Sequence, residues 1–235
     1  MLKESEPQRI DDGFRPSEST GQALSVTTVE NDFVSDVYHR ISSWYDLFFG
    51  PTLHAGRLEA IQKLPIQSGD EILEVGIGTG INAALYPKDC SVKGIDFSAA
   101  MLRKASKRIS ANQVKNVELI KMDAAALEFD DESFDLVYAP YVISVVTDPI
   151  KVAREMYRVC RVGGHIVVLN HFRSEHPVLS KAEKVLSPLT VHIGFRADLD
   201  LSGFLSQADL NPISVEKVNI PKMWSLITIR KDASV

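Results

Sequence analysis

The most informative stretch of this sequence is Glu74-Val75-Gly76-Ile77-Gly78-Thr79-Gly80. It follows Asp70-Glu71-Ile72-Leu73, a short run whose apolar end predicts a buried strand. Glycines at alternate positions allow a tight turn in which the backbone comes close to a ligand, because no Cβ is in the way. The alternative is an ordinary glycine-rich turn between a strand and a helix.

Two acidic residues indicate which ligand such a turn would hold. Glu74 lies two places before the first glycine, and Asp96 lies at the end of the next predicted strand. This layout fits a nucleoside ligand. A dinucleotide fingerprint would place its third glycine at position 81, where this chain has Ile81. The turn therefore does not point to a pyrophosphate in particular.

Composition limits the possible classes of protein. With 235 residues, 45% apolar and 24% charged, the chain is typical of one globular domain with a full core. The net charge of -5 argues against a nucleic acid as the main partner. Cys90 and Cys160 lack the spacing of a metal or redox site, so we expect free thiols in a reducing cytosol and no metal. Neither a secretory signal nor an apolar run of the roughly 18 residues that span a bilayer is evident.

The N-terminal part of the chain divides into two segments. Residues 1–30 are rich in polar residues, proline and glycine, which predicts a disordered tail to which we assign no role. Residues 31–235 form one domain, in which residues 31–65 are expected to be a helical lid. Its first helix carries apolar side chains at three- and four-residue steps, namely Phe33, Val37, Ile41, Trp44, Tyr45 and Phe48.

The role of that first helix has two interpretations. It packs on the domain as a lid, or it offers one face to a membrane surface, for which Trp and Tyr side chains are well suited. Its polar face mixes acidic and basic residues, which favours the packed lid. Gly50-Pro51 ends the helix, and a second helix is predicted from Thr52 to Leu64.

Strands and helices alternate after the glycine turn. Further strands are predicted at 91–95, 117–122, 134–139, 165–170, 213–218 and 224–230. Helices are predicted at 81–86, 99–110 with Ser98 as N-cap, 149–160 with Asp148 as N-cap, 178–188 and 198–208, with a turn at 162–164. The fold class is therefore α/β, a doubly wound, mostly parallel seven-stranded sheet that ends in an antiparallel hairpin.

Several polar or small residues follow predicted strands. Parallel strands end at the same edge of a sheet, and ligands bind beyond that edge. The residues expected there are Gly76, Asp96, Asp123, Ala139, Asn170 and His171. A separate basic set on the helix at 99–110 forms either a solvated face or a contact with anionic lipid: Arg103, Lys104, Lys107 and Arg108.

These motifs resemble known proteins at two levels. The Glu-x-Gly-x-Gly-x-Gly turn with Asp96 resembles the class I, Rossmann-like S-adenosylmethionine-dependent methyltransferases. Leu85-Tyr86-Pro87, Val145-Val146-Thr147-Asp148-Pro149 and above all Leu169-Asn170-His171-Phe172 are similar to the soluble bacterial phosphatidylethanolamine N-methyltransferases of the Rhodobacter type. The resemblance covers about residues 33–231. Pro140-Tyr141 departs from the pattern, where smaller or aliphatic residues are expected.

The resemblance implies a set of residues that bind S-adenosylmethionine and its product S-adenosylhomocysteine. The turn would hold the methionine part, Asp96 the ribose, and residues after the second and third strands the adenine. Tyr38 and Tyr45 would close over the cofactor. The complete implied set is Tyr38, Tyr45, Glu74, Gly76, Ile77, Gly78, Thr79, Gly80, Asp96, Phe97, Met101, Asp123, Ala124 and Ala139.

The chemistry of amine methylation selects further candidates. The amine must lose a proton before attack, and His171 or His39 is suited to accept it. A quaternary ammonium product is attracted to aromatic faces, for which Tyr38, Trp44, Tyr45, Tyr141 and Phe172 are candidates. The lipid phosphate needs a cation, drawn from Arg40, Arg173, His176, His192 and Arg196. We therefore predict catalytic residues Tyr45, Tyr141 and His171, and substrate-binding residues Arg40, Trp44, Asn170, His171, Phe172, Arg173 and Arg196.

The resemblance thus implies methylation of the amine of phosphatidylethanolamine, successively to phosphatidylcholine. The expected location is the cytoplasm, at the inner face of an anionic membrane, and the expected state is a monomer without a nucleic-acid partner. A methyltransferase of a quinone precursor or of another small acceptor is the first alternative. A cofactor-binding protein without catalysis is the second.

Overall fold

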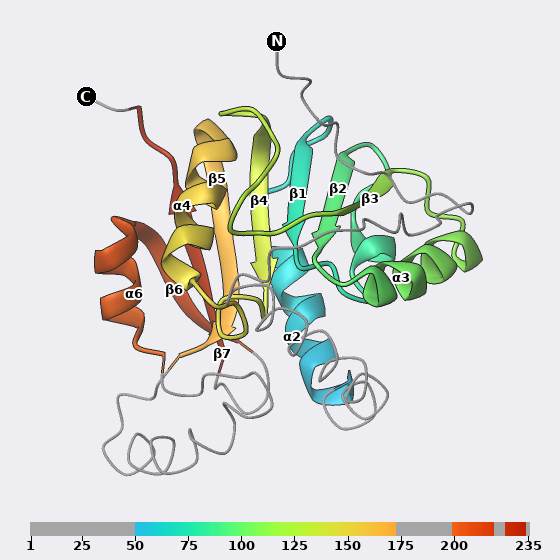
Figure 1. Ribbon diagram of the computed structural model, residues 1–235, viewed down its shortest axis with the longest axis horizontal. Coiled ribbons are helices and arrows are strands. Elements are labelled where there is room, and N and C mark those ends of the chain that lie inside the picture. Colours follow the sequence, from blue (N-terminus) through green and yellow to red (C-terminus); the bar gives the residue numbers. More distant parts are fainter. Residues whose placement is uncertain (1–49, 173–198, 219–223, 234–235) are drawn as a thin grey trace, which may run out of the picture.

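A seven-stranded sheet lies at the centre of the computed structural model, which describes residues 50–172, 199–218 and 224–233. The strand order is β3-β2-β1-β4-β5-β7-β6. The strands are β1 Glu71–Val75, β2 Ser91–Asp96, β3 Val117–Lys121, β4 Phe134–Pro140, β5 Cys160–His171, β6 Pro212–Val218 and β7 Trp224–Arg230. Strands β1 to β5 pair in parallel, whereas β7 is antiparallel to both β5 and β6. Figure 1 shows this twisted sheet, and the predicted fold class is confirmed.

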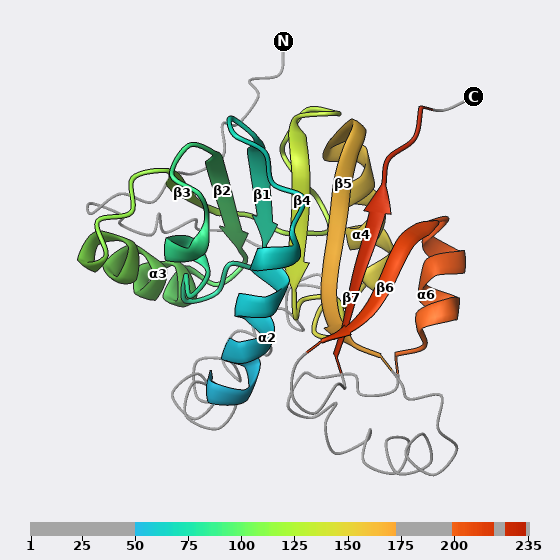
Figure 2. The same cartoon turned by 180° about the vertical axis from the view of Figure 1, so that it is seen from behind.

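The central strands are apolar because both faces of the sheet are covered. In β1, the run Ile72-Leu73-Glu74-Val75 is buried throughout. Helices α2 (Gly50–Lys63) and α3 (Ala99–Ala111) cover one face, and α4 (Pro149–Val159) and α6 (Leu201–Ala208) cover the other. Figure 1 and Figure 2 show the sheet from opposite sides, with α4 in front in the first and α2 in front in the second.

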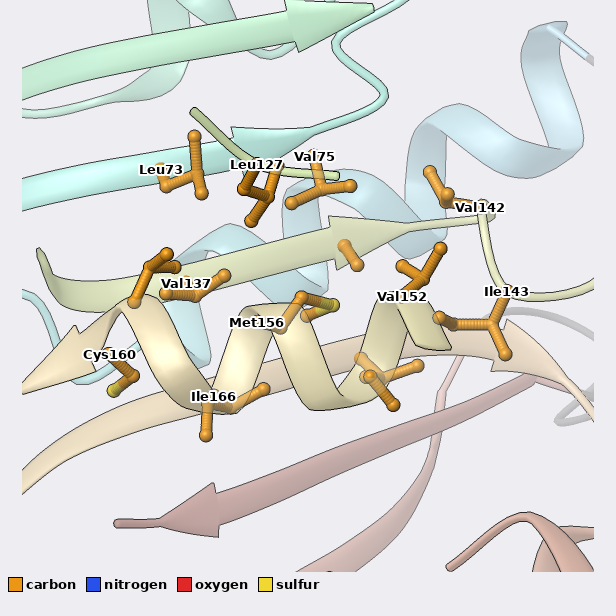
Figure 3. Close-up of a cluster of buried hydrophobic side chains, with 14 of the residues drawn as sticks. Leu73, Val75, Leu127, Val137, Val142, Ile143, Val152, Met156, Cys160 and Ile166 are labelled. Carbon is orange, nitrogen blue, oxygen red and sulfur yellow. The ribbon is translucent and has the colours of Figure 1, made fainter. Parts of the chain in front are cut away.

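The larger apolar core lies between the sheet and α4. The buried side of α4 carries Val152, Met156 and Val159, spaced three or four residues apart. In the close-up of Figure 3, Met156 and Val152 lie on the side of α4 that faces β4, where Val137 is labelled. This packing fixes the segment between β4 and α4, which forms one wall of the site described below.

Two helix starts form as the sequence predicts. The Ser98 hydroxyl accepts a hydrogen bond from the backbone N–H of Met101, and an Asp148 carboxylate oxygen accepts one from Lys151 at 2.9 Å. Pro149 occupies the first turn of α4, where its missing N–H costs nothing. Both capped ends lie at the carboxyl edge of the parallel strands.

Three predicted elements differ from the structure. The helix predicted at 81–86 is one turn of 3-10 helix, η1 (Ala83–Leu85). Residues 162–164 belong to β5, because Gly163 donates to the Lys231 carbonyl (2.7 Å) and the Gly164 carbonyl accepts from Lys231 (2.9 Å). Residues 199 and 200 precede α6, since the Asp200 carboxylate caps it by accepting from Gly203 N at 2.7 Å. The predicted tail at 1–30, the first helix of the lid and the helix at 178–188 lie outside the described residues.

Two further findings concern only the described ranges. Within them, no helix is both long enough and apolar enough to cross a membrane. Nor do these ranges bring together a group of three or more His, Cys, Asp or Glu side chains able to hold a metal ion.

Candidate active site

A cavity of about 260 Å³ lies at the carboxyl edge of the parallel strands. Its wall is built from the segments that follow β1, β2, β3 and β4, together with Arg57 from α2. The lining residues include Gly76, Ile77, Gly78, Thr79, Asp96, Phe97, Met101, Met122, Asp123, Ala124, Tyr141, Val142 and Thr147. The sequence predicts a ligand site at this edge of the sheet.

The glycine loop after β1 depends on glycine at two positions for different reasons. Gly76 has φ +70°, and a Cβ there would collide with the Val142 side chain. Gly78 has φ +58° and no heavy atom nearer than 4.0 Å to where its Cβ would lie. The backbone at Gly78 is therefore open toward a ligand, whereas Gly76 is needed for packing against the opposite wall.

Asp96 holds the glycine loop against the start of α3. One carboxylate oxygen accepts from Gly78 N at 2.9 Å, and the other accepts from Ser98 N at 2.8 Å. Burial raises the pKa of this carboxyl, and the two backbone hydrogen bonds lower it. Each carboxylate oxygen has more than one lone-pair site, so a further hydroxyl donor can be accepted from the cavity.

Arg108 fixes the loop from the side of α3. Its guanidinium donates to the Thr79 carbonyl at 2.9 Å and to the Thr79 hydroxyl at 3.0 Å. Thr79 lines the cavity, so this contact bears directly on the shape of the wall. Of the four basic residues on this helix, Arg108 is thus committed to an internal contact.

Glu74 lies behind the cavity wall, with only 1% of its surface exposed. Its carboxylate accepts hydrogen bonds from Asn82 Nδ2 (2.6 Å) and from the Tyr86 hydroxyl (2.8 Å). Burial raises the pKa of Glu74 to about 7, while these two donors and the charge of Arg57 lower it. Two buried atoms without a hydrogen-bond partner among the described residues, Asn82 Oδ1 and the Tyr138 hydroxyl, belong to the same region.

A cluster of aromatic and cationic side chains forms where β4, β5 and β7 meet. The Tyr141 ring contacts Trp224 edge-to-face, with centroids 4.9 Å apart, and His171 contacts the same Trp at 5.6 Å. Above the Tyr141 ring lies the Arg57 guanidinium, 4.9 Å from the centroid. Tyr141 has φ +61° and donates its N–H to the Leu169 carbonyl at 2.6 Å. A non-glycine residue in this conformation is held there by its surroundings.

Asn170 and Phe172 face away from this cluster. The Asn170 side-chain carbonyl accepts from the Ser144 backbone N–H (3.3 Å) and hydroxyl (3.2 Å), and its amide donates to the His171 carbonyl at 2.7 Å. Phe172 is buried against Phe204 of α6, with centroids 5.8 Å apart. In the structure, Asn170 joins β5 to the wall segment after β4, and Phe172 is part of the core.

The structure brings together most of the described residues predicted to bind the cofactor. Those that line the cavity are Gly76, Ile77, Gly78, Thr79, Asp96, Phe97, Met101, Asp123 and Ala124. Glu74, Gly80 and Ala139 do not line the cavity, because each of them contacts residues behind the cavity wall. The candidates outside the described residues are Tyr38, His39, Arg40, Trp44, Tyr45, Arg173, His176, His192 and Arg196.

Sequence reasoning missed Arg57 and Trp224. Trp224 begins the last strand, and because β7 runs antiparallel to β5, its first residue lies at the edge where β5 ends. The C-terminal hairpin predicted from the sequence therefore already indicated that Trp224 would lie near the site. Arg57 follows Gly56 in α2, and Gly56 and Ala60 are the buried positions among residues 56–63, so a helical projection places Arg57 beside the packed face.

The fold and the cavity define a doubly wound α/β protein with a ligand site at the carboxyl edge of its parallel strands. A family model described as a methyltransferase domain matches residues 73–168. The chain is 39% identical over 171 residues to the phosphatidylethanolamine N-methyltransferase of Cereibacter sphaeroides, covering 72% of this chain and 83% of that protein. It is 31% identical to the ubiquinone/menaquinone biosynthesis C-methyltransferase UbiE of Pseudoalteromonas translucida, covering 66% of this chain and 67% of that protein.

A solved structure shares the fold. It is the Haemonchus contortus protein named Phospholethanolamine N-methyltransferase 2, in complex with phosphomonomethylethanolamine and S-adenosylhomocysteine. The TM-score is 0.68 at 18% identity, covering 86% of this chain and 60% of that one. The chain belongs to the class I S-adenosylmethionine-dependent methyltransferases.

The residues of the cavity fit this cofactor. The open backbone at Gly78 admits a ligand group, and the Asp96 and Asp123 carboxylates are acceptors for hydroxyl and amino groups. Apolar side chains of Met101 and Met122 complete the same part of the wall. The cofactor is S-adenosylmethionine.

Proposed function

We propose that this protein methylates the amine of phosphatidylethanolamine, in successive rounds that end at phosphatidylcholine. The observation that carries the proposal is the 39% identity over 83% of the Cereibacter sphaeroides phosphatidylethanolamine N-methyltransferase. The proposal includes action by a monomer in the cytoplasm, at the inner face of an anionic membrane. The first helix of the lid would dock there, as its aromatic side chains suit an interface.

The chain's part in the reaction is to position the reactants and exclude water. The bound cofactor supplies a methyl group activated by its sulfonium, and an amine nitrogen attacks that methyl in line. We propose that Gly76, Gly78 and Thr79 of the loop hold the amino-acid part, and that Asp96 accepts hydrogen bonds from the ribose hydroxyls. Asp123 and Ala124 would lie at the adenine, with Phe97 and Met101 beside its faces.

The acceptor would approach from the Tyr141–Trp224–His171 cluster, beside the end of the cavity that Tyr141 lines. An amine that starts protonated must give up one proton before each attack. His171 is the proposed acceptor, directly or through a water. As methyl groups accumulate, the nitrogen becomes a cation with no N–H, which Tyr141 and Trp224 would hold by cation–π attraction of roughly 0.5 to 2 kcal/mol each.

A second candidate is methylation of a quinone precursor, favoured by the 31% identity to UbiE. A C-methylation has no cationic product to hold. Replacement of Trp224 by leucine should therefore impair amine methylation, above all the final round, and leave a carbon acceptor much less affected.

The test uses purified full-length protein, labelled S-adenosylmethionine and vesicles of phosphatidylethanolamine with phosphatidylglycerol. The proposal predicts labelled mono-, di- and trimethylated lipid in sequence when the lipids are separated by chromatography. If calorimetry shows intact cofactor binding and no lipid is labelled, the phospholipid assignment is wrong while the family assignment stands.

A further inference from the structure

Arg57 is the cationic side chain of the cavity: among the lining residues in the described part of the chain, no other Lys or Arg is present. It projects from α2 and is partly exposed. Within residues 50–172, 199–218 and 224–233 its guanidinium forms no ion pair with a carboxylate. Its charge acts on Glu74 only through space, lowering the pKa of that carboxyl. A cation in a ligand cavity that has no carboxylate partner among the described residues is suited to an anionic ligand group.

The position of Arg57 along the cavity selects the group. The sheet order places the ends of β3, β2, β1 and β4 in a row, which the cavity wall follows. Asp123 and Asp96 stand at the β3 and β2 end, and Tyr141 with Arg57 stands at the β4 end. The β3 and β2 end is therefore acidic. At the β4 end the Arg57 guanidinium is accompanied by one carboxylate, Asp148, which caps α4 by accepting from the Lys151 backbone N–H.

The cofactor has matching ends. Its adenosine part offers hydroxyl and amino donors, which suit the two aspartates, and its amino-acid part carries a carboxylate. We infer that Arg57 binds the α-carboxylate of S-adenosylmethionine, and thereby fixes the direction in which the cofactor lies across the strand ends. This inference rests on the cofactor assignment and is independent of which acceptor is methylated.

The guanidinium is held ready for this contact. Its central carbon lies over the Tyr141 ring, 4.9 Å from the centroid, and the Tyr141 backbone is itself held by the hydrogen bond to Leu169. A planar guanidinium on an aromatic face keeps its edge donors free for a bidentate contact with a carboxylate. Lysine at this position would retain the positive charge but lose the paired N–H donors of the planar guanidinium, so Arg57→Lys is not a neutral exchange.

The test is a comparison of two ligands by titration calorimetry. S-adenosylhomocysteine carries the carboxylate, and methylthioadenosine lacks the whole amino-acid part. For Arg57→Met we expect the Kd of S-adenosylhomocysteine to rise about tenfold to a hundredfold. The Kd of methylthioadenosine should change by less than about twofold, since that ligand has nothing for the guanidinium to bind.

The matched control is Lys63→Met, which removes the same charge from the same helix. The Lys63 amine contacts Glu59 (3.2 Å) and Glu216 (2.7 Å) on the surface, away from the cavity. Its replacement should leave both Kd values unchanged. Arg57→Lys is the second variant, with an intermediate loss for S-adenosylhomocysteine, and thermal melting followed by circular dichroism verifies that each variant is folded.

Three results would overturn the inference. Equal losses for both ligands would mean that Arg57 only maintains the shape of the cavity. An unchanged Kd for S-adenosylhomocysteine would mean that the guanidinium does not bind the cofactor. An unchanged Kd together with a raised KM for a phosphate-bearing acceptor would assign Arg57 to that phosphate instead.

Discussion

At the scale of single residues, Glu74 combines nearly complete burial with a group that can ionise. The unfolded chain would ionise it near its ordinary pKa of 4.5, whereas burial raises the pKa in the folded protein to about 7. Between these values the unfolded state loses the proton and the folded state keeps it, so stability falls as pH rises through this window. Above this pH window, the burial of Glu74 lowers the free energy of unfolding by a constant amount of about 3 kcal/mol.

Glu74→Gln removes this dependence because glutamine does not titrate. Relative to the variant, the original protein should lose about 3 kcal/mol of unfolding free energy between about pH 4.5 and about pH 8. Urea denaturation of both proteins at the two pH values measures the difference. A difference that does not vary with pH would show that Glu74 titrates normally in the folded state.

Gly76 is constrained both by its backbone and by its neighbour. Alanine there would adopt φ +70° and collide with Val142, so Gly76→Ala should cost about 2 to 5 kcal/mol of unfolding free energy. Gly69 is the matched control, since it has φ +87° and open space around its absent Cβ. Gly69→Ala should cost only about 1 to 2 kcal/mol, the backbone part alone. Equal losses in urea denaturation would refute the role of Val142.

At the scale of elements, Arg108 couples α3 to the glycine loop. Arg108→Met removes two hydrogen bonds from a charged donor to Thr79, worth about 1.5 to 3 kcal/mol together. Because Thr79 lines the cavity, the Kd of S-adenosylhomocysteine should rise several-fold in calorimetry, with no extra loss in binding to vesicles. Lys107→Met is the control on the exposed face of the same helix and should leave cofactor binding unchanged. Weaker vesicle binding with normal cofactor affinity would instead assign Arg108 to lipid.

Local sequence patterns were sufficient for most elements, and long-range pairing explains the exceptions. Ser98 and Asp148 were identifiable as caps because the hydrogen bond of a cap spans only three residues. The extension of β5 through Gly163 was not identifiable, because its partner Lys231 lies far along the chain. A Gly-Gly pair in isolation predicts a turn, and only the neighbouring strand makes it part of a sheet.

At the scale of the whole molecule, the sheet order explains which site residues could be predicted from the sequence. Asp96 and Asp123 follow strands directly, so the rule that ligands bind beyond strand ends was enough to select them. Arg57 comes from a helix that precedes the sheet, and its place over Tyr141 depends on how α2 packs across β1 and β4. Asn170 follows the same strand-end rule, yet its amide is used by Ser144 and His171, which no spacing in the sequence reveals.

A competition assay distinguishes the amine of a phospholipid from the carbon of a quinone precursor as the methyl acceptor. Purified protein and labelled S-adenosylmethionine would be incubated with anionic vesicles that contain both phosphatidylethanolamine and a quinone precursor. We predict label in methylated phosphatidylethanolamine species and little in the quinone. Label confined to the quinone would contradict the phospholipid assignment and would make the carbon acceptor the substrate of this methyltransferase.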